Sequence, residues 1–312
     1  MSSKYLLGVD GGTEGLRAGL FDTSGSPLAY ASTTYPTQFP APSWAEQDPR
    51  DWWSALGKSV RKVIHDSGIG AEQIAAMAVD TTCCSVVALD KNGNPLRPAL
   101  IWMDVRSAEQ AEQMVETKDE ALRINSNGNG PVSAEWMIPK ALWIKQKEPE
   151  LFKQAVTICE YQDYINFHLT GHRTASINNV STRWHCDYSR DGIPETLLEK
   201  LELDELSEKW PEKVLRLGEV VGGLTPAAAE HLGLHADLPV VQGGADAQIG
   251  MIGLGVVKPG SLAFITGSSH LQLGLSEKPF HGTVIWGTYA DALLPGLYTV
   301  EGGQTSTGSV VN

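Results

Sequence analysis

A short glycine-rich turn between two apolar runs, GVDGGTEGLRAGLFD from Gly8 to Asp22, most constrains how this chain can fold. The flanking runs have the length and apolar content of β-strands. Glycine permits unusual φ angles and a close approach, and such a turn exposes backbone N–H groups that can wrap a phosphate. Asp10 ends the first strand, where a carboxylate can hold a divalent cation on that phosphate. A plain β-hairpin is the alternative explanation.

The same strand–turn–strand form recurs in AFITGSSHLQLGL, from Ala263 to Leu275, which favours the phosphate interpretation of both turns. Further apolar runs predict strands at residues 74–80, 85–90, 238–244, 261–267 and 283–289. Helices are predicted at 49–67, 107–117 and 139–147, the first with Asp48 as N-cap and Pro49 at its first position. Strands mixed with helices indicate an α/β protein. The charged region 189–215 is predicted to be a surface insertion containing helices.

Composition sets limits on partners and location. The 312 residues suffice for about two domains, and the net charge of −13 argues against a duplex nucleic-acid partner. No apolar run approaches the length of a membrane span, and the first residues make a poor signal peptide. The four cysteines lack CxxC spacing, which favours reduced thiols. We therefore predict a cytoplasmic protein with neither a nucleic-acid nor a membrane partner.

Eight segments, in order along the whole chain, resemble the FGGY carbohydrate kinases of the actin/Hsp70/hexokinase-like superfamily. The segments are GVDGGTEGLRAGLFD, SWAEQDPRDWW, PALIWMDVRS, PKALWIKQKEPELF, DYINFHLTG, VVQGGADAQIGMIGLG, ITGSSH and EGGQTSTGS. The resemblance implies a ribonuclease H-like (actin-like ATPase) α/β domain with a mixed sheet flanked by helices. That domain is expected over residues 1–257, and the beginning of a second, similar domain over 258–312.

The resemblance also implies a reaction, the phosphorylation of a sugar or polyol hydroxyl with ATP and Mg²⁺. Asp246, in GGADAQIG, stands where the family has its catalytic base. A carboxylate there can accept the proton that the attacking hydroxyl loses. The alternative role for Asp246 is the N-cap of a small-residue helix over 247–254.

Two sets of residues correspond to the family's ATP phosphate site. Asp10 is expected to bind Mg²⁺, and His270 stands where many members have glycine. Arg17 has a structural salt bridge as its alternative role. The expected phosphate-binding residues are Gly11, Gly12, Thr13, Glu14 and Arg17 in the first turn, and Thr266, Gly267, Ser268 and Ser269 in the second.

The sugar pocket resembles that of the ribulokinase branch. AVDTTCCSVVALD, from Ala78 to Asp90, lacks the methionine–histidine pair of xylulose kinases, and EWMIPKALW matches a glutamate–tryptophan pair of ribulokinases. Carboxylates suit a polyol because they accept hydrogen bonds from several hydroxyls. Trp136 has a core role as its alternative, and Cys83 and Cys84 are interpreted as buried thiols. The candidate sugar-binding residues are Asp80, Thr82, Asp104, Glu135, Trp136 and Asp246, with NNVSTRWH, from Asn178 to His185, as a further candidate segment.

Members of the family are considerably longer than this chain, which ends where a helix of the second domain is expected to open. We therefore expect a fragment that is inactive or weakly active alone. A xylulose or other polyol kinase, a non-catalytic sugar-binding remnant and an ATPase with a protein partner are the alternatives. The retained Asp10, Arg17 and Asp246 argue against a non-catalytic remnant. The alternative of an ATPase with a protein partner leaves the segment SWAEQDPRDWW unexplained. The exact sugar, the adenosine site and a homodimer are left open.

Overall fold

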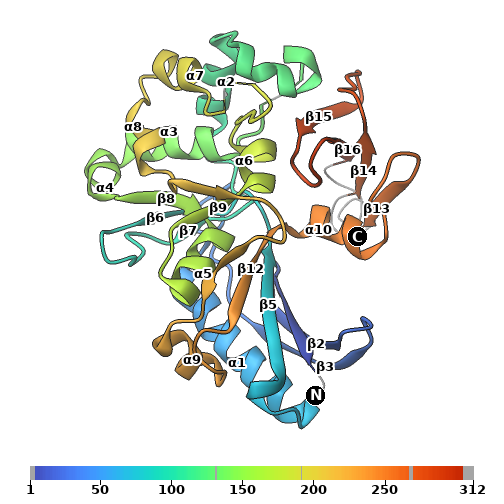
Figure 1. The fold of residues 1–312 in the computed structure, drawn as a ribbon. Helices are drawn as coiled ribbons and strands as arrows, with labels where there is room; N and C mark the ends of the chain where they lie inside the picture. The colour runs from blue at the N-terminus through green and yellow to red at the C-terminus, as the bar shows by residue number, and fades with distance from the viewer. Residues whose placement is uncertain (1–3, 131, 191, 267–269, 305–312) are drawn as a thin grey trace. The chain divides into compact units, whose positions relative to one another are not determined.

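The computed structural model describes residues 4–130, 132–190, 192–266 and 270–304. Figure 1 shows their helices and strands, which group into two compact units, each assembled from separate stretches of chain. Unit 1 comprises Met1–Asp104, Glu150–Ser176 and Lys209–Asp246, and unit 2 comprises Val105–Pro149, Ile177–Glu208 and Ala247–Asn312. The domain boundary predicted after residue 257 stays a prediction.

A six-stranded mixed sheet forms the centre of unit 1, with the order β11-β12-β5-β1-β2-β3 (Figure 1). Its central strands β12, β5 and β1 are mutually parallel, while β2, β3 and β11 pair antiparallel with their neighbours. The strands are β1 (Tyr5–Gly11), β2 (Gly15–Asp22), β3 (Pro27–Thr34), β5 (Ile74–Thr81), β11 (Val220–Gly223) and β12 (Pro239–Ala245). The predicted mixed α/β architecture is confirmed.

Helix α1 (Pro49–Ser67) packs against β2 and β3 and has the predicted bounds. The Asp48 carboxylate accepts a hydrogen bond from the Arg50 N–H, so the predicted N-cap is confirmed. Gly68 ends the helix with a φ of 67°, a conformation that glycine adopts without strain. Trp52 is fully buried on the core face and Trp53 only partly, so the former is the stronger core residue.

The rest of unit 1 surrounds this sheet. Two further helices, α5 (Tyr161–Thr170) and α9 (Pro226–Leu232), contact α1. A second sheet has the order β4-β7-β6-β8, and β9 pairs with β10. The remaining elements are β4 (Glu46–Gln47), η1 (Ala71–Gln73), β6 (Val86–Leu89), β7 (Ala99–Leu100), α4 (Pro149–Gln154), β8 (Thr157–Glu160), β9 (Thr174–Ser176) and β10 (Lys213–Leu215).

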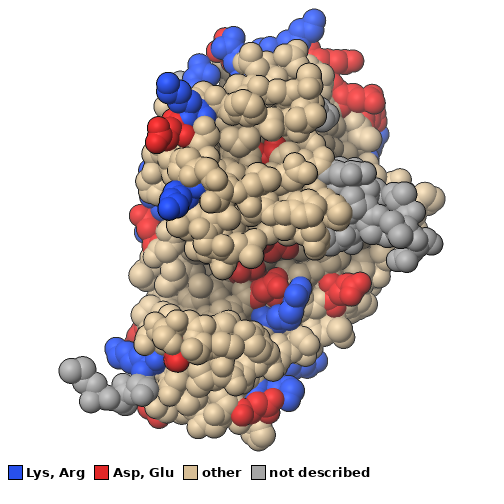
Figure 2. Space-filling model, turned by 90° about the vertical axis from the view of Figure 1, so that its right-hand side faces the viewer, with Lys and Arg blue, Asp and Glu red and all other residues tan. Residues whose placement is uncertain are grey.

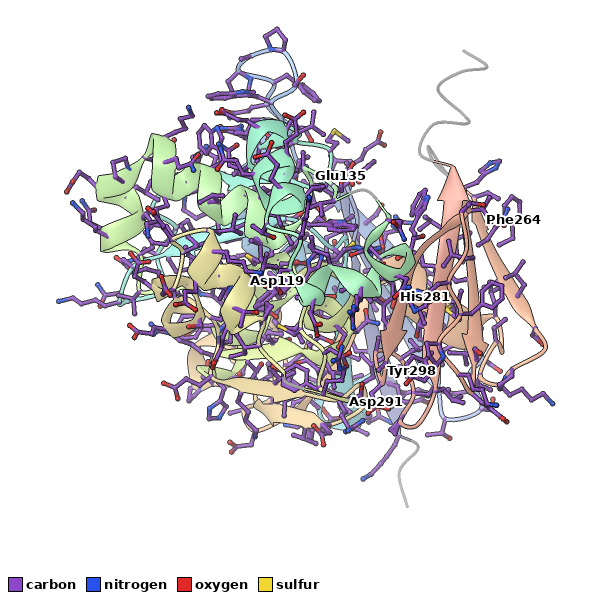
Figure 3. The ribbon with its side chains drawn as sticks, turned by 90° about the horizontal axis from the view of Figure 1, so that it is seen from above. Asp119, Glu135, Phe264, His281, Asp291 and Tyr298 are labelled. Carbon is purple, nitrogen blue, oxygen red and sulfur yellow. The ribbon has the colours of Figure 1, made fainter. Side chains whose placement is uncertain are left out.

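Unit 2 contains an antiparallel sheet of order β13-β14-β16-β15 and most of the other helices. Strands β13 (Leu262–Thr266) and β14 (His270–Ser276) pair antiparallel, so both strands of the second predicted strand–turn–strand unit are confirmed, while residues 267–269 lie outside the described residues. Phe264 lies on the edge strand β13 and is 51% exposed (Figure 3). The other elements are α2 (Ala108–Glu116), η2 (Glu120–Ile124), η3 (Ser126–Gly128), α3 (Met137–Lys147), α6 (Ile177–Arg183), α7 (Glu195–Lys200), α8 (Glu205–Lys209), α10 (Asp246–Gly253), β15 (Ile285–Ala290) and β16 (Tyr298–Gln304).

The charged region 189–215 has a buried side. It contains helices α7 and α8, as expected, and its being a surface insertion stays a prediction. Leu197, Leu198 and Leu206 are at most 1% exposed. The leucines between the charges therefore form a buried apolar face that the composition of the region conceals.

The surface carries charges of both signs. On the face drawn in Figure 2, Lys and Arg side chains are interspersed with Asp and Glu among the described residues. None of the described helices is both long enough and apolar enough to cross a membrane.

Candidate active site

Three acidic residues lie at the carboxyl ends of the three central strands of unit 1. Asp10 on β1 is in register with Asp80 on β5, and Thr81 of β5 pairs with Ala245 of β12, directly before Asp246. Because these strands are adjacent and parallel, their carboxyl ends meet at one edge of the sheet. Open α/β sheets bind ligands outside that edge. The structure thus brings together the predicted Mg²⁺ ligand, one predicted sugar ligand and the predicted base.

These carboxylates perturb one another. Burial, and then the neighbouring charges of Asp10 and Asp246, raises the pKa of Asp80 well above its ordinary value. Burial also raises the pKa of Asp10, and the charge of Arg17 partly offsets that rise. The Arg17 Nε lies 3.3 Å from the Asp10 Oδ2. Negative charge is therefore crowded at this edge, and a bound cation or proton would relieve the crowding.

Side chains of unit 1 hold the first glycine turn in place. The Gly12 N–H donates to the Gly15 carbonyl (3.1 Å), and the Tyr35 hydroxyl donates to the Gly12 carbonyl. The Gln47 amide donates to the Thr13 carbonyl (2.7 Å), and the Trp102 indole N–H donates to the Thr13 hydroxyl (2.8 Å). These contacts fix the backbone of the turn before any ligand binds.

Gly11 is required by an aromatic stack beneath the turn. A Cβ at this position would lie 2.8 Å from the Tyr161 ring, which is closer than packed atoms approach. The Tyr161 ring stacks on Trp52 with centroids 3.7 Å apart, and its hydroxyl lies 3.2 Å from that of Tyr35. Sequence analysis missed both tyrosines, since no local pattern marks them.

The loop after β5 is tied both to the turn and to β8. The Thr82 N–H donates to the Gly11 carbonyl (2.9 Å), and the Cys84 N–H donates to the Glu160 carboxylate (2.9 Å). Cys84 is buried, as interpreted from the sequence, but Cys83 is only partly buried. Thr82, a candidate sugar ligand, thus shares its loop with a thiol that solvent can reach.

Asp104 is fully buried in unit 1. Its carboxylate Oδ2 accepts a hydrogen bond from the Ala45 N–H at 2.6 Å. This contact joins the chain after β7 to the segment before β4. A structural role is therefore visible for Asp104, and a sugar contact stays a prediction.

The predicted glutamate–tryptophan pair lies in unit 2, directly before α3. Burial raises the pKa of Glu135, against the charges of Lys140 and Arg183 (Figure 3). Trp136 is 7% exposed, and its ring centroid lies 5.2 Å from that of His185. Trp136 thus packs in the interior of unit 2, while contacts of the pair with sugar stay predictions.

A buried ion pair in unit 2 was missed by sequence analysis. The Arg183 guanidinium binds the Glu301 carboxylate through two hydrogen bonds of 2.8 and 2.7 Å. Their side chains are 10% and 1% exposed. Arg183 stands in the candidate segment NNVSTRWH and Glu301 in the family-like segment EGGQTSTGS, but nothing in either segment indicates that the two residues meet.

Residues 5–253 match the N-terminal domain of the FGGY family of carbohydrate kinases. The chain belongs to this family. An FGGY carbohydrate kinase domain-containing protein of Homo sapiens is 31% identical over 99% of this chain. A ribulokinase of Shouchella clausii is 30% identical over 98% of this chain. The crystal structure of xylulose kinase from Rhodospirillum rubrum aligns with a TM-score of 0.88 and 27% identity over 99% of this chain and 62% of that chain. The present FGGY chain spans about 60% of the length of these curated relatives.

Part of the second phosphate site of this FGGY chain lies outside the described residues. Thr266 is the last residue of β13, while Gly267, Ser268 and Ser269 are among the residues not described. Within the described ranges, no three His, Cys, Asp or Glu side chains are arranged to hold a metal ion. The phosphate-binding roles of Glu14 and of the second turn stay predictions.

His185 makes the stability of the FGGY chain dependent on pH. Burial, and then the charge of Arg183, lowers the pKa of His185 to about 3, and neither ring nitrogen has a hydrogen-bond partner among the described residues. The ordinary pKa of histidine is 6.5, so at pH values between 6.5 and about 3 the unfolded chain binds a proton at His185 that the folded chain does not. We therefore expect stability that is present above pH 6.5 to be lost on acidification, by about 2 kcal/mol between pH 7 and pH 5.

Urea unfolding of wild type and His185→Asn at these two pH values measures this loss. Asparagine tolerates the φ of 58° at this position, so the variant should fold and show the smaller acid-induced loss. His65→Asn is the matched control, because the His65 side chain is 87% exposed and should leave the loss unchanged. Equal losses in wild type and His185→Asn would contradict the prediction.

Proposed function

We propose that this FGGY chain supplies the sugar site, the catalytic base and two phosphate-binding turns of an ATP-dependent kinase that phosphorylates a sugar or polyol hydroxyl. The observation that carries this proposal is the placement of Asp246 at the same sheet edge as Asp10 and the glycine turn. One edge thus combines a base with groups suited to phosphate and metal, which is what phosphoryl transfer requires.

Asp246 acts as the general base in this proposal. Its carboxylate accepts the proton of the sugar hydroxyl as that oxygen attacks the terminal phosphorus, so the proton ends on Asp246. Asp80 assists by position: burial and its acidic neighbours raise its pKa and favour its protonated form. A proton on Asp80 lessens the repulsion that a charged Asp246 meets, and a neutral carboxyl group can donate a hydrogen bond to a sugar oxygen.

The first turn and Asp10 fit magnesium-bound phosphates. Mg²⁺ is usually held by one or two protein carboxylates together with water and substrate phosphates, and Asp10 is a partly exposed carboxylate beside Asp80. When bound, Mg²⁺ neutralises charge on the transferring phosphoryl group. The turn Gly11–Glu14 offers backbone N–H groups, and Arg17, 66% exposed, offers a mobile positive charge for the same group. Thr266 and the three residues after it are proposed as the second phosphate turn.

A ribulose-type ketopentose is the proposed substrate. DTTCC after Asp80 and the Glu135–Trp136 pair support this choice, together with relatives named ribulokinase. Xylulose is the second candidate, because one aligned structure is of a xylulose kinase. The cytoplasmic location, the absence of nucleic-acid and membrane partners, and a homodimer stay predictions.

A coupled ADP-release assay over three- to six-carbon sugars and polyols tests the substrate. The assay uses a protein that contains this chain and has the length of its relatives. The highest kcat/KM is expected for ribulose, because its hydroxyls meet the carboxylates of the ribulokinase-like pocket. A higher value for xylulose or glycerol would overturn the substrate and leave the kinase proposal standing. No release with any of these compounds would overturn both.

Separate calorimetric titrations with D-ribulose and with ATP distinguish the other classes of protein. A kinase binds both ligands. A non-catalytic remnant binds sugar without ATP, and an ATPase with a protein partner binds ATP without sugar.

A further inference from the structure

Two adjacent thiols lie in the loop that carries the candidate sugar ligand Thr82. The sulfur atoms of Cys83 and Cys84 are 3.6 Å apart, and neither residue takes part in a disulfide. Cys83 is partly exposed, so a small oxidant in solvent can reach it. Cys84 has a φ of 63°, which places its backbone in the left-handed region. The pair therefore combines an accessible thiol with a second thiol that needs little movement to meet it.

The other two cysteines are buried, as is Cys84 at 3% exposed, so Cys83 alone among the four cysteines is partly exposed. Cys159 and Cys186 are 1% and 2% exposed. Burial raises the pKa of each thiol, so that little reactive thiolate forms at neutral pH. The chain thus carries one pair of adjacent thiols with a partly exposed member, and two buried thiols elsewhere that serve as internal controls.

We propose that Cys83 and Cys84 are an oxidation-sensitive dithiol that closes to a vicinal disulfide under hydrogen peroxide. The Cys83 thiolate attacks one peroxide oxygen, the O–O bond breaks, and a sulfenic acid and water form. The Cys84 thiol then attacks the sulfenic sulfur, the S–O bond breaks, and a second water leaves. Two electrons pass from the two thiols to the peroxide, and both thiol protons end in water.

The disulfide is easily reversed. Neighbouring Cα atoms are about 3.8 Å apart across a trans peptide bond, which is shorter than the usual span of a disulfide. A ring closed over so short a span is strained, and strained disulfides are reduced more readily. A small thiol should therefore restore the dithiol.

Closure must turn the backbone of the loop. The Thr82 N–H is bonded to the Gly11 carbonyl, and the Cys84 N–H to the Glu160 carboxylate. New torsion angles between Cys83 and Cys84 turn the peptide group that carries the Cys84 N–H, so its bond to Glu160 breaks and the loop that carries Thr82 loses one of its two anchors. Oxidation therefore weakens sugar binding, a consequence that rests on the proposed function, whereas the disulfide itself does not.

Peptide mass analysis after peroxide treatment and alkylation with N-ethylmaleimide under denaturing conditions tests the chemistry. Trypsin places both thiols in peptide 63–91, and Cys159 and Cys186 in peptides 154–173 and 184–190. Peptide 63–91 is expected to lose two hydrogens and to take no maleimide, whereas the other two peptides are alkylated. Dithiothreitol before alkylation should restore two maleimide adducts on peptide 63–91.

Variants assign the reaction to the pair. Cys83→Ser should abolish the loss of two hydrogens, Cys84→Ser should instead leave a sulfenic acid that dimedone traps, and Cys186→Ser should behave as wild type. An unmodified peptide 63–91, a sulfonic acid there in the wild type, or a disulfide between two chains on a non-reducing gel would overturn the proposal.

Ribulose titration of the reduced and the oxidised protein tests the consequence. We expect binding to weaken by about tenfold or more on oxidation and to recover with dithiothreitol. Unchanged affinity in a protein whose disulfide has formed would overturn the link between the loop and the sugar. Absence of ribulose binding in the reduced protein would count against the proposed function. The peptide masses would still show whether Cys83 and Cys84 form a disulfide.

Discussion

Asp246→Asn is expected to lower kcat by at least about 100-fold in a protein that contains this chain and has the length of its relatives. Asparagine has nearly the same size as aspartate but cannot accept the proton of the attacking hydroxyl. Its amide still forms hydrogen bonds, so the affinity for sugar should change little. Steady-state kinetics together with sugar titration separate these two effects.

The other end of the same strand provides the matched control. Asp237 is exposed just before β12 and has a φ of 62°, which asparagine also adopts. Asp237→Asn therefore makes the same chemical change away from the carboxyl end of the sheet, and kcat should stay at the wild-type value. If Asp246→Asn retained more than a tenth of wild-type kcat, Asp246 would not be the base.

Glu301→Gln is expected to lower the free energy of unfolding by about 3–5 kcal/mol. The substitution keeps the size of the side chain but removes the charge that compensates Arg183, which is 10% exposed. A buried guanidinium without a carboxylate loses hydration that its remaining contacts do not replace. Urea unfolding followed by tryptophan fluorescence measures the change.

An exposed ion pair serves as the control for this prediction. Lys153 and Glu150 are 2.9 Å apart but 69% and 77% exposed, so Glu150→Gln should cost less than about 1 kcal/mol. The double variant Arg183→Met with Glu301→Leu should recover stability relative to Glu301→Gln, because the guanidinium and the carboxylate that pairs with it are then removed together. A loss below about 1 kcal/mol in Glu301→Gln would show that water reaches the pair.

Local signals in the sequence predicted the elements that place the candidate site. Asp48 and Pro49 mark the start of α1 because capping depends on a few adjacent residues. The β1–β2 turn and the positions of Asp10 and Asp246 follow from apolar runs that end in acidic or small residues. The resemblance to the family then indicated which of these strand ends belong to one site.

Contacts between distant segments were not predictable in this way. Tyr35 meets Gly12 and Tyr161, and Arg183 meets Glu301, only after the chain has folded back on itself. The buried leucines of the region 189–215 were not predicted, because its composition averages them with solvated charges. Both failures arise from tertiary packing, which local composition does not encode.

The order of the central strands has a consequence for how the chain folds during synthesis. Strand β5 ends at Thr81, but its parallel neighbour β12 begins only at Pro239 (Figure 1). Pairing across so long a separation is slow, because the intervening chain must lose conformational entropy before contacts between the two strands compensate for that loss. Until β12 leaves the ribosome, β5 presents an unpaired apolar edge that can associate with other nascent chains. We therefore expect the yield of this protein to depend on translation speed and chaperone supply.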